Sequence, residues 1–132
     1  MSRENVEIVR RAAEEYNRTG VEALHDFLHP DVEFTEDSRF PEAGVYRGRD
    51  AVETYFREFR QQMAGHSLEL EEMVDAGEEV VAVIRERARG TSSDAEVEWR
   101  AAFVWTMQGG MAVRGRAYLD PAEALEAVGL RE

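Results

Sequence analysis

Two glutamates are the residues whose positions best suit acid/base chemistry. Glu86 lies within an expected strand, residues 79–89, on a face that is otherwise apolar, while arginines occupy the opposite face. Apolar surroundings disfavour the charged form of a carboxyl group, which suits a general acid or base. Glu36 follows a short expected strand, residues 32–35, and precedes Asp37. If Glu36 and Glu86 share one site, their different surroundings would divide the roles of acid and base between them.

Each glutamate also has a purely structural interpretation. Glu86 could lie at an open rim of the fold or pair with Arg87, and Glu36 with Asp37 could form a solvated acidic loop. A buried and unpaired Glu86 would destabilise the fold, so the change Glu86→Leu would then stabilise the protein. If an arginine neutralises Glu86, the same change would destabilise the protein instead.

The clearest pattern in the chain is a pair of alternating strands near its end. Every odd position from Val97 to Met107 is apolar, and the odd positions from Val113 to Leu119 are apolar or glycine. A period of two indicates a strand with one buried face. The members of these faces that we predict to line a ligand pocket are Trp99, Phe103, Trp105, Gly115, Ala117 and Leu119.

The apolar faces of these two strands coincide only if the numbers of paired residues sum to an even number. That condition predicts a turn of odd length, and a three-residue turn, Gly109–Met111, fits best. Trp105 then lies opposite Gly115, and Phe103 opposite Ala117. Large rings that face such small residues either fill a core or form the wall of a hollow.

Helix and strand patterns add four more residues to the predicted pocket. Ala12 and Tyr16 lie one turn apart on the apolar stripe of the first expected helix, and the Tyr16 hydroxyl could face a ligand. Phe56 lies on the apolar side of a later helix, and Ile84 lies on the inner face of strand 79–89.

Composition excludes several classes of partner and cofactor. The 132 residues suffice for one domain, residues 1–132, and their net charge of −12 argues against nucleic acid or an anionic membrane as a partner. Without cysteine there is no disulfide, thiol nucleophile or thiolate metal ligand. His25, His29 and His66 have no carboxylate placed with them to complete a metal site. We therefore expect no metal, no cofactor and, without a signal sequence or a membrane-spanning run, a cytoplasmic protein.

The order of the expected elements predicts an α+β fold. In this fold a strongly curved, mainly antiparallel sheet wraps around about three helices, and a further helix ends the chain. Capping boxes are predicted at Thr19 with Glu22 and at Asp50 with Glu53, and Asp120 should cap the last helix. The expected order is helices 2–19 and 20–28, strand 32–35, a long connection 36–46, helix 50–63, strands 67–74 and 79–89 around a turn at 75–77, a turn at 90–94, strands 97–107 and 113–119, and a helix ending at Gly129.

Four segments in this order resemble the SnoaL-like branch of the nuclear transport factor 2-like superfamily, which also contains ketosteroid isomerase and limonene epoxide hydrolase. The segments are ENVEIVRRAAEEYNRTGVEAL, HPDVEF, GVYRGRDAVETYF and FVWTMQGGMAVRGRAYLDPAEALEAVGL. The resemblance covers essentially the whole chain, and it implies a cone-shaped fold with a deep, mostly apolar pocket, commonly in a homodimer. It does not fix an activity, because the fold hosts isomerases, cyclases, hydrolases, dehydratases and proteins without chemistry.

Carried over residue by residue, the isomerase pattern is only partly present. Its general-base carboxylate falls at Glu36, and a pocket phenylalanine falls at Glu86. Its two oxyanion donors fall at Ala12 and Phe103, neither of which can donate a hydrogen bond. The catalytic aspartate of the epoxide hydrolase pattern falls at Ala117. Any chemistry in this chain would therefore need another arrangement of groups.

Three functions follow from these patterns. The first is a cofactor-free isomerase, cyclase or hydrolase that moves a proton on a polyketide-, steroid- or terpenoid-like molecule. The second is a non-catalytic binder of such a molecule. The third is a dimerisation or interaction module whose pocket is filled by Trp99, Phe103 and Trp105. We rank a pocket for a small apolar ligand first, with the chemistry undecided.

A homodimer is predicted from the face of the sheet opposite the pocket. That face carries Ala102 and Val104 together with Arg116 and Tyr118, and it is more apolar than a solvated face requires.

Overall fold

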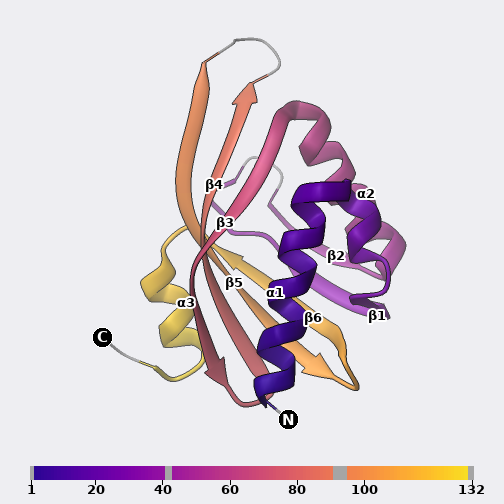
Figure 1. Cartoon of the computed structure of the whole chain (residues 1–132), viewed down its shortest axis with the longest axis vertical. Coiled ribbons are helices and arrows are strands. Elements are labelled where there is room, and N and C mark those ends of the chain that lie inside the picture. The colour runs from indigo at the N-terminus through magenta and orange to yellow at the C-terminus, as the bar shows by residue number, and fades with distance from the viewer. Residues whose placement is uncertain (1, 41–42, 91–94, 131–132) are drawn as a thin grey trace.

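A single curved sheet with helices on both of its sides makes up the protein. The computed structural model describes residues 2–40, 43–90 and 95–130, and it confirms the predicted α+β class (Figure 1). In chain order the elements are α1 (Ser2–Thr19), the 3-10 helix η1 (Gly20–Leu24), β1 (Leu28–Thr35), β2 (Val45–Arg47), α2 (Arg49–Gln62), β3 (Met63–Ala76), β4 (Glu79–Gly90), β5 (Glu96–Gln108), β6 (Met111–Tyr118) and α3 (Pro121–Ala127).

The six strands follow the order β2-β1-β6-β5-β4-β3. Among the strands of the described residues, β1 and β6 are parallel neighbours and the other neighbours are antiparallel. Figure 1 shows α1 and α2 on one side of the sheet and α3 on the other. The main core lies between the sheet and the first two helices, and a smaller core lies under α3. The pocket predicted from the sequence therefore belongs to the larger, inner core.

The helix α1 forms because its apolar residues recur on one stripe, and two of them, Val9 and Tyr16, are buried against the sheet. Its last turn also protects an edge of the sheet. The side-chain amide of Asn17 donates to the carbonyl oxygen of Leu68 at 2.6 Å, and its oxygen accepts from the backbone N–H of Leu68 at 2.8 Å. Asn17 thus replaces a neighbouring strand at this point of the edge strand β3.

Two predicted capping boxes are wrong. The hydroxyl of Thr19 donates back to the carbonyl oxygen of Glu15, and the short helix that follows is a 3-10 turn that ends at Leu24. The helix α2 begins after Gly48 without a side-chain cap, and Glu53 instead contacts His25, with 2.9 Å between its Oε2 and the imidazole Nδ1. A tertiary partner, His25, thus took Glu53 from its expected cap, whereas Thr19 bonds back to its own helix. The cap at Asp120 is confirmed, since its side chain accepts from the N–H of Ala122.

The hairpin of β5 and β6 has the predicted register but not the predicted turn. Trp105 lies opposite Gly115 and Phe103 opposite Ala117, as expected. The turn, however, has only two residues, because Gln108 already pairs with Met111. A register shift next to Thr106 reconciles the two observations, since it places an extra residue in β6 and changes the parity of pairing. The parity argument failed because it assumed strands without a bulge.

The apolar outer face that suggested a homodimer is covered within the chain itself. Ala102 and Val104 are fully buried, and they pack in one cluster with Ala124 of α3. Tyr118 packs against the same cluster. The apolar character of this face is therefore explained by α3, and the dimer itself stays a prediction.

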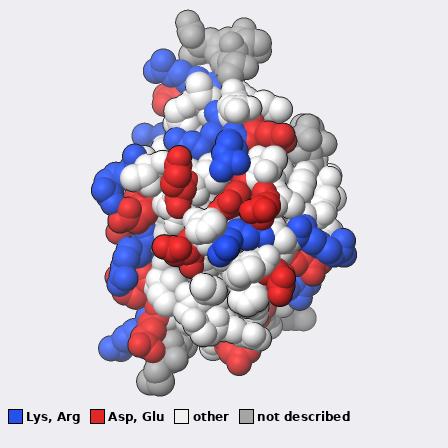
Figure 2. All heavy atoms as spheres, turned by 90° about the vertical axis from the view of Figure 1, so that its right-hand side faces the viewer, with Lys and Arg blue, Asp and Glu red and all other residues white. Residues whose placement is uncertain are grey.

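Two predictions from the sequence concern residues that the structure does not describe. The predicted turn at residues 90–94 falls largely outside the described residues, as does Pro41 in the connection after β1. Among the helices of the described part, none combines the length and apolar character needed to cross a membrane. Acidic and basic side chains are interspersed over the face of the molecule that Figure 2 shows.

Gly115 offers a direct test of how tightly the inner core is packed. A Cβ at this position would overlap the ring of Trp105 and would lie 2.8 Å from Cδ1 of Phe34. We expect Gly115→Ala to lower the free energy of unfolding by about 1–3 kcal/mol, as overpacking does elsewhere. Urea unfolding monitored by circular dichroism measures this change.

The matched control is the same substitution made in a Trp105→Leu background. Removing the indole ring opens the space, so the cost of Gly115→Ala should be smaller there. An equal cost in both backgrounds would show that contact with Trp105 is not its cause.

Candidate functional site

A buried chain of hydrogen bonds joins four elements at the centre of the inner core. The hydroxyl of Tyr16 in α1 lies 2.9 Å from Nδ1 of His66 in β3. The Nε2 of His66 lies 2.6 Å from Oε1 of Glu86 in β4. The other carboxylate oxygen, Oε2, accepts from the indole N–H of Trp99 in β5 at 3.1 Å. Glu86 is thus buried with partners on both oxygens, and neither partner is an arginine.

Three members of this hydrogen-bonded chain are shielded from water, and Trp99 is half-buried. Tyr16, His66 and Glu86 are exposed by 2%, 4% and 5% respectively, and burial raises the pKa of Tyr16 to about 12. The imidazole of His66 stacks on Trp99, with the rings inclined by 16°. The guanidinium of Arg60 lies 4.8 Å from the centre of the Tyr16 ring, in the position of a cation–π contact.

Glu36 forms a second buried carboxylate site at the end of β1. Its Oε1 accepts from the backbone N–H of Asp37 at 2.8 Å, and its Oε2 accepts a short hydrogen bond from the hydroxyl of Tyr55 in α2. Burial raises the pKa of Glu36 above its usual range, although these two hydrogen bonds oppose the rise and the nearby charge of Glu86 adds to it. Burial, followed by the hydrogen bond to Glu36, also raises the pKa of Tyr55.

Asp37 is turned away from this site although it is adjacent to Glu36. Its carboxylate accepts from the Arg39 guanidinium and from the backbone N–H of Leu119, the latter at 2.7 Å. The hydrogen bonds from Arg39 hold the pKa of Asp37 well below its usual range. Arg39 also pairs with Glu123 at 2.8 Å, which ties the segment after β1 to α3. Asp37 is therefore part of the architecture, and Glu36 is the carboxylate that faces inward.

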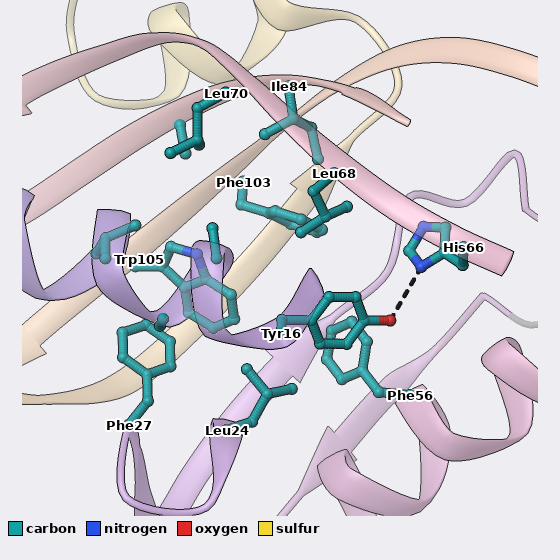
Figure 3. A pocket seen from close by; sticks show the side chains of 14 residues that line it. Tyr16, Leu24, Phe27, Phe56, His66, Leu68, Leu70, Ile84, Phe103 and Trp105 are labelled. Carbon is teal, nitrogen blue, oxygen red and sulfur yellow. Dashed lines mark hydrogen bonds between the residues drawn. The ribbon is translucent and has the colours of Figure 1, made fainter. Parts of the chain in front are cut away.

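Two small cavities adjoin the hydrogen-bonded chain. The larger has a volume of about 40 Å³ and is almost entirely apolar (Figure 3). Figure 3 shows the Tyr16 hydroxyl directed at His66, while the rings of Phe27, Phe56 and Trp105 surround the space. The smaller has a volume of about 20 Å³. A volume of this order holds no more than a few water molecules.

Glu36 and Glu86 both line the smaller cavity, although 50 positions separate them in the chain. Three residues, Phe56, His66 and Phe103, line both cavities and form the partition between them. Glu36 with Ala117 and Tyr118 also borders an open cleft of about 520 Å³ on the surface. The carboxylate of Glu36 thus lies between the surface and the interior.

The sequence and the fold both resemble those of known proteins. The model of the SnoaL-like domain matches residues 9–115. The chain belongs to the SnoaL-like domain family. No curated protein matches it in sequence.

Solved structures with the same fold as this SnoaL-like domain differ widely from it in sequence. An NTF2-like protein of unknown function from Burkholderia pseudomallei K96243 is 23% identical, with a TM-score of 0.79 over 96% of this chain and 98% of that one. A protein of Jannaschia sp. CCS1 that carries the name SnoaL-like polyketide cyclase is 15% identical, with a TM-score of 0.78 over 98% and 94%. TerC, co-crystallised with polyporic acid, is 19% identical, with a TM-score of 0.78 over 95% and 98%.

The structure places most of the predicted pocket residues of this SnoaL-like domain around the two cavities. Glu36, Glu86 and Ala117 line the smaller one. Those that line the larger one are Ala12, Tyr16, Phe56, Ile84, Phe103 and Trp105, and two of these, Phe56 and Phe103, also line the smaller.

Three predicted pocket residues line neither of the two cavities. Gly115 is covered by the ring of Trp105, so the small residue receives the large ring directly and leaves no hollow between the strands. Trp99 lies behind His66, where it supports the imidazole and Glu86. The backbone of Leu119 binds Asp37, on the side away from the interior.

Sequence reasoning missed His66 and Tyr55. His66 shares a strand face with Leu68 and Leu70, so their period of two could have extended the strand back to it. A bulge between Ala64 and Ser67 sets the direction of His66 and hid that continuity. Tyr55 lies three residues after Val52 and is buried with it against the sheet.

The candidate site of this SnoaL-like domain contains no cluster that could hold a metal ion among the described residues. The three histidines have different partners. His25 contacts Glu53, His29 accepts from the N–H of Asp31, and His66 belongs to the buried chain of hydrogen bonds. The chemistry available at this site is that of two carboxyl groups, an imidazole and two phenols.

Replacing Glu86 tests whether the buried chain is fully paired. The change Glu86→Leu would leave His66 Nε2 and the Trp99 N–H without partners in a dry site, so we expect it to lower the free energy of unfolding by about 3–5 kcal/mol. This outcome is opposite to the gain expected for an unpaired glutamate. Glu86→Gln, which keeps one acceptor and the side-chain volume, is the control and should cost less. Thermal and urea unfolding at pH 7 measure both, and a Leu variant as stable as the parent would contradict the assignment.

The pH dependence of stability should report the burial of Glu36. Because its pKa is raised in the folded protein, the folded state holds this proton more tightly than the unfolded chain does. The resulting stabilisation is fully present below the unfolded pKa and is lost as pH rises through the raised folded pKa. We expect the free energy of unfolding of the parent to fall, relative to that of Glu36→Gln, as pH rises from about 4, near the ordinary carboxyl pKa, through neutral pH.

Urea unfolding across that interval measures the difference between parent and variant. The matched control is Glu33→Gln, because Glu33 lies on the same strand with its side chain half-exposed; it should show no such trend. A parent that gains stability relative to Glu36→Gln as pH rises would contradict the assignment.

Proposed function

We propose that this SnoaL-like domain binds a small, mostly apolar molecule in its inner core and moves a proton on it, with Glu36 as the acid/base group and no cofactor. The observation that carries the proposal is that Glu36 and Glu86 line one enclosed, largely aromatic cavity. Two carboxyl groups in such a place are costly to the fold, and sites of proton transfer are where such groups gather.

The surroundings of the two carboxyl groups support a division of roles. Glu86 is held by His66 and Trp99, which fix its orientation. Glu36 has only a phenol and a backbone N–H as partners, and its raised pKa favours exchange of a proton. Glu36 also borders the open cleft, from which a substrate could reach it.

An apolar ligand suits the lining of the larger cavity, where aliphatic and aromatic side chains predominate. The name of the Jannaschia protein and the polyporic acid bound to TerC are in keeping with polyketide-like ring compounds. The cavities, at about 40 and 20 Å³, are far smaller than typical ligand pockets of ~300–1,000 Å³. A ring-sized ligand would therefore enter by separating Phe56 and Phe103, which would join the two spaces.

The small volumes also favour a second candidate function. If the aromatic rings stay closed, the domain is a non-catalytic module for dimerisation or ligand binding whose ancestral site has been filled.

A homodimer belongs to both proposals. It would use parts of the sheet that α3 leaves uncovered, where ion pairs such as Arg85–Glu71 and Arg87–Glu98 lie on the outer face. Sedimentation at micromolar concentration tests this, and a monomer would contradict it.

Proton transfer can be tested with 5-nitrobenzisoxazole, a compact aromatic probe. A base removes its one ring C–H proton adjacent to nitrogen, the N–O bond breaks, and the released phenolate is coloured. If Glu36 is the base, Glu36→Gln should lose most of the acceleration, about 10²–10⁴-fold, because general-base catalysis contributes on this order. Glu33→Gln should keep the activity of the parent.

One result would decide against the enzyme. A parent no faster than Glu36→Gln would remove the catalytic role and leave the non-catalytic candidate. Indole fluorescence then distinguishes binding of the probe without catalysis from no binding at all, because Trp105 lines the larger cavity and should respond when the probe binds there.

A further inference from the structure

We infer that the ligand of this site carries a hydrogen-bond donor, a hydroxyl or an N–H group, at the end of its apolar body that enters the smaller cavity. The inference rests on the proposed function and narrows its ligand class. It follows from an account of which polar atoms around Glu36 and Glu86 are already used.

The first step concerns the direction of the hydrogen bonds at Glu86. An ionised carboxylate can only accept hydrogen bonds, so with Glu86 ionised the His66 Nε2 that lies 2.6 Å away carries the proton. A neutral imidazole then has its Nδ1 as an acceptor, and Tyr16 donates its hydroxyl proton to it. The indole N–H of Trp99 also donates to Glu86. Every bond in the chain therefore points toward the carboxylate.

The second step concerns Glu36, where the direction is the same. The hydroxyl of Tyr55 and the backbone N–H of Asp37 both donate to its carboxylate. The donor groups of Tyr16, His66 and Trp99 are likewise already engaged in hydrogen bonds. A ligand thus meets carboxylate oxygens that still have lone pairs to offer, since two oxygens together provide about four acceptor positions.

The remaining lining of the smaller cavity adds one further donor to this account, the hydroxyl of Tyr118, which also borders the open cleft. Except for Tyr118, the other side chains there are Phe40, Phe56, Phe59, Ala101, Phe103 and Ala117, which have no polar atom. The hydroxyl oxygen of Tyr118 accepts from the guanidinium of Arg116 at 3.4 Å. Arg116 itself borders the open cleft and not the smaller cavity.

A ligand with a carbonyl group would therefore place an acceptor against acceptors. A hydroxyl or amine would instead complete the hydrogen bonding of two buried carboxylates, and an ammonium group would also be attracted by their charge. This polarity is the reverse of the oxyanion-donor arrangement of the isomerase pattern, whose donor positions here are Ala12 and Phe103.

The test uses four compact rings that differ at one position: cyclopentanol, cyclopentylamine, cyclopentanone and cyclopentane. Binding is followed at pH 8 by two-dimensional ¹H–¹⁵N NMR of the indole N–H groups. The chain has two tryptophans; Trp99 reports on the smaller cavity through Glu86, and Trp105 reports on the larger. We expect the alcohol and the amine to bind at least about tenfold more tightly than the ketone and the hydrocarbon, because a site built for a donor rejects a ligand without one.

Two variants examine the cause of the preference. Glu36→Gln introduces an amide that can donate, so it should raise the affinity for cyclopentanone relative to cyclopentanol. Glu33→Gln, the same carboxyl-to-amide change on β1 but outside both cavities, is the matched control and should leave the preference unchanged. A dominant amine indicates charge recognition, and equal binding of alcohol and amine indicates recognition of a neutral donor; either outcome supports the inference.

Two outcomes would overturn it, and they are distinguishable. Equal affinity for cyclopentanone and cyclopentanol in the parent would refute the donor preference while leaving an apolar ligand site intact. Failure of all four compounds to shift either indole signal would refute the apolar ligand site of the proposed function, and with it this inference.

Discussion

The burial of the Glu86 carboxylate is the constraint on which the inner half of this molecule depends. A carboxyl group in a dry core is tolerable only when its oxygens have partners, and here those partners come from β3 and β5, the strands on either side of β4. His66 passes the connection on to Tyr16, so α1 is joined to the sheet by a polar contact as well as by apolar packing. One buried carboxyl group therefore fixes the relative positions of a helix and three strands.

The same constraint shapes the space in which a ligand could lie. His66 must reach Glu86, and its ring then stands between the two cavities with Phe56 and Phe103. Trp105 fills the hollow over Gly115, so the aromatic rings occupy much of the volume that a wide cone would leave open. The site is consequently small and divided, and the movement of Phe56 and Phe103 decides whether it can take a ring-sized molecule.

Two adjacent acids at the end of β1 illustrate how packing separates chemistry from architecture. Glu36 is turned inward to Tyr55, and Asp37 is turned outward to Arg39 and Leu119. The paired Asp37 is easily ionised, whereas Glu36 is not, because a guanidinium stabilises a carboxylate far better than a phenol does. The outward ion pair with Arg39 also anchors the segment that holds Glu36 in place.

Periodicity determined the class of fold and the buried faces of the strands, because a period of two or of 3.6 depends only on neighbouring residues. The pairing of Trp105 with Gly115 was predicted through a three-residue turn, which the structure replaces with a two-residue turn and a bulge. Resemblance of four segments added the family. What the tertiary structure decided was everything that joins distant parts of the chain. It put Glu36 beside Glu86, gave Glu53 to His25 instead of a helix cap, and set His66 into the buried chain through a bulge. Bulges, partners and cavity volumes depend on the packing of several elements at once, and no local pattern in the sequence records them.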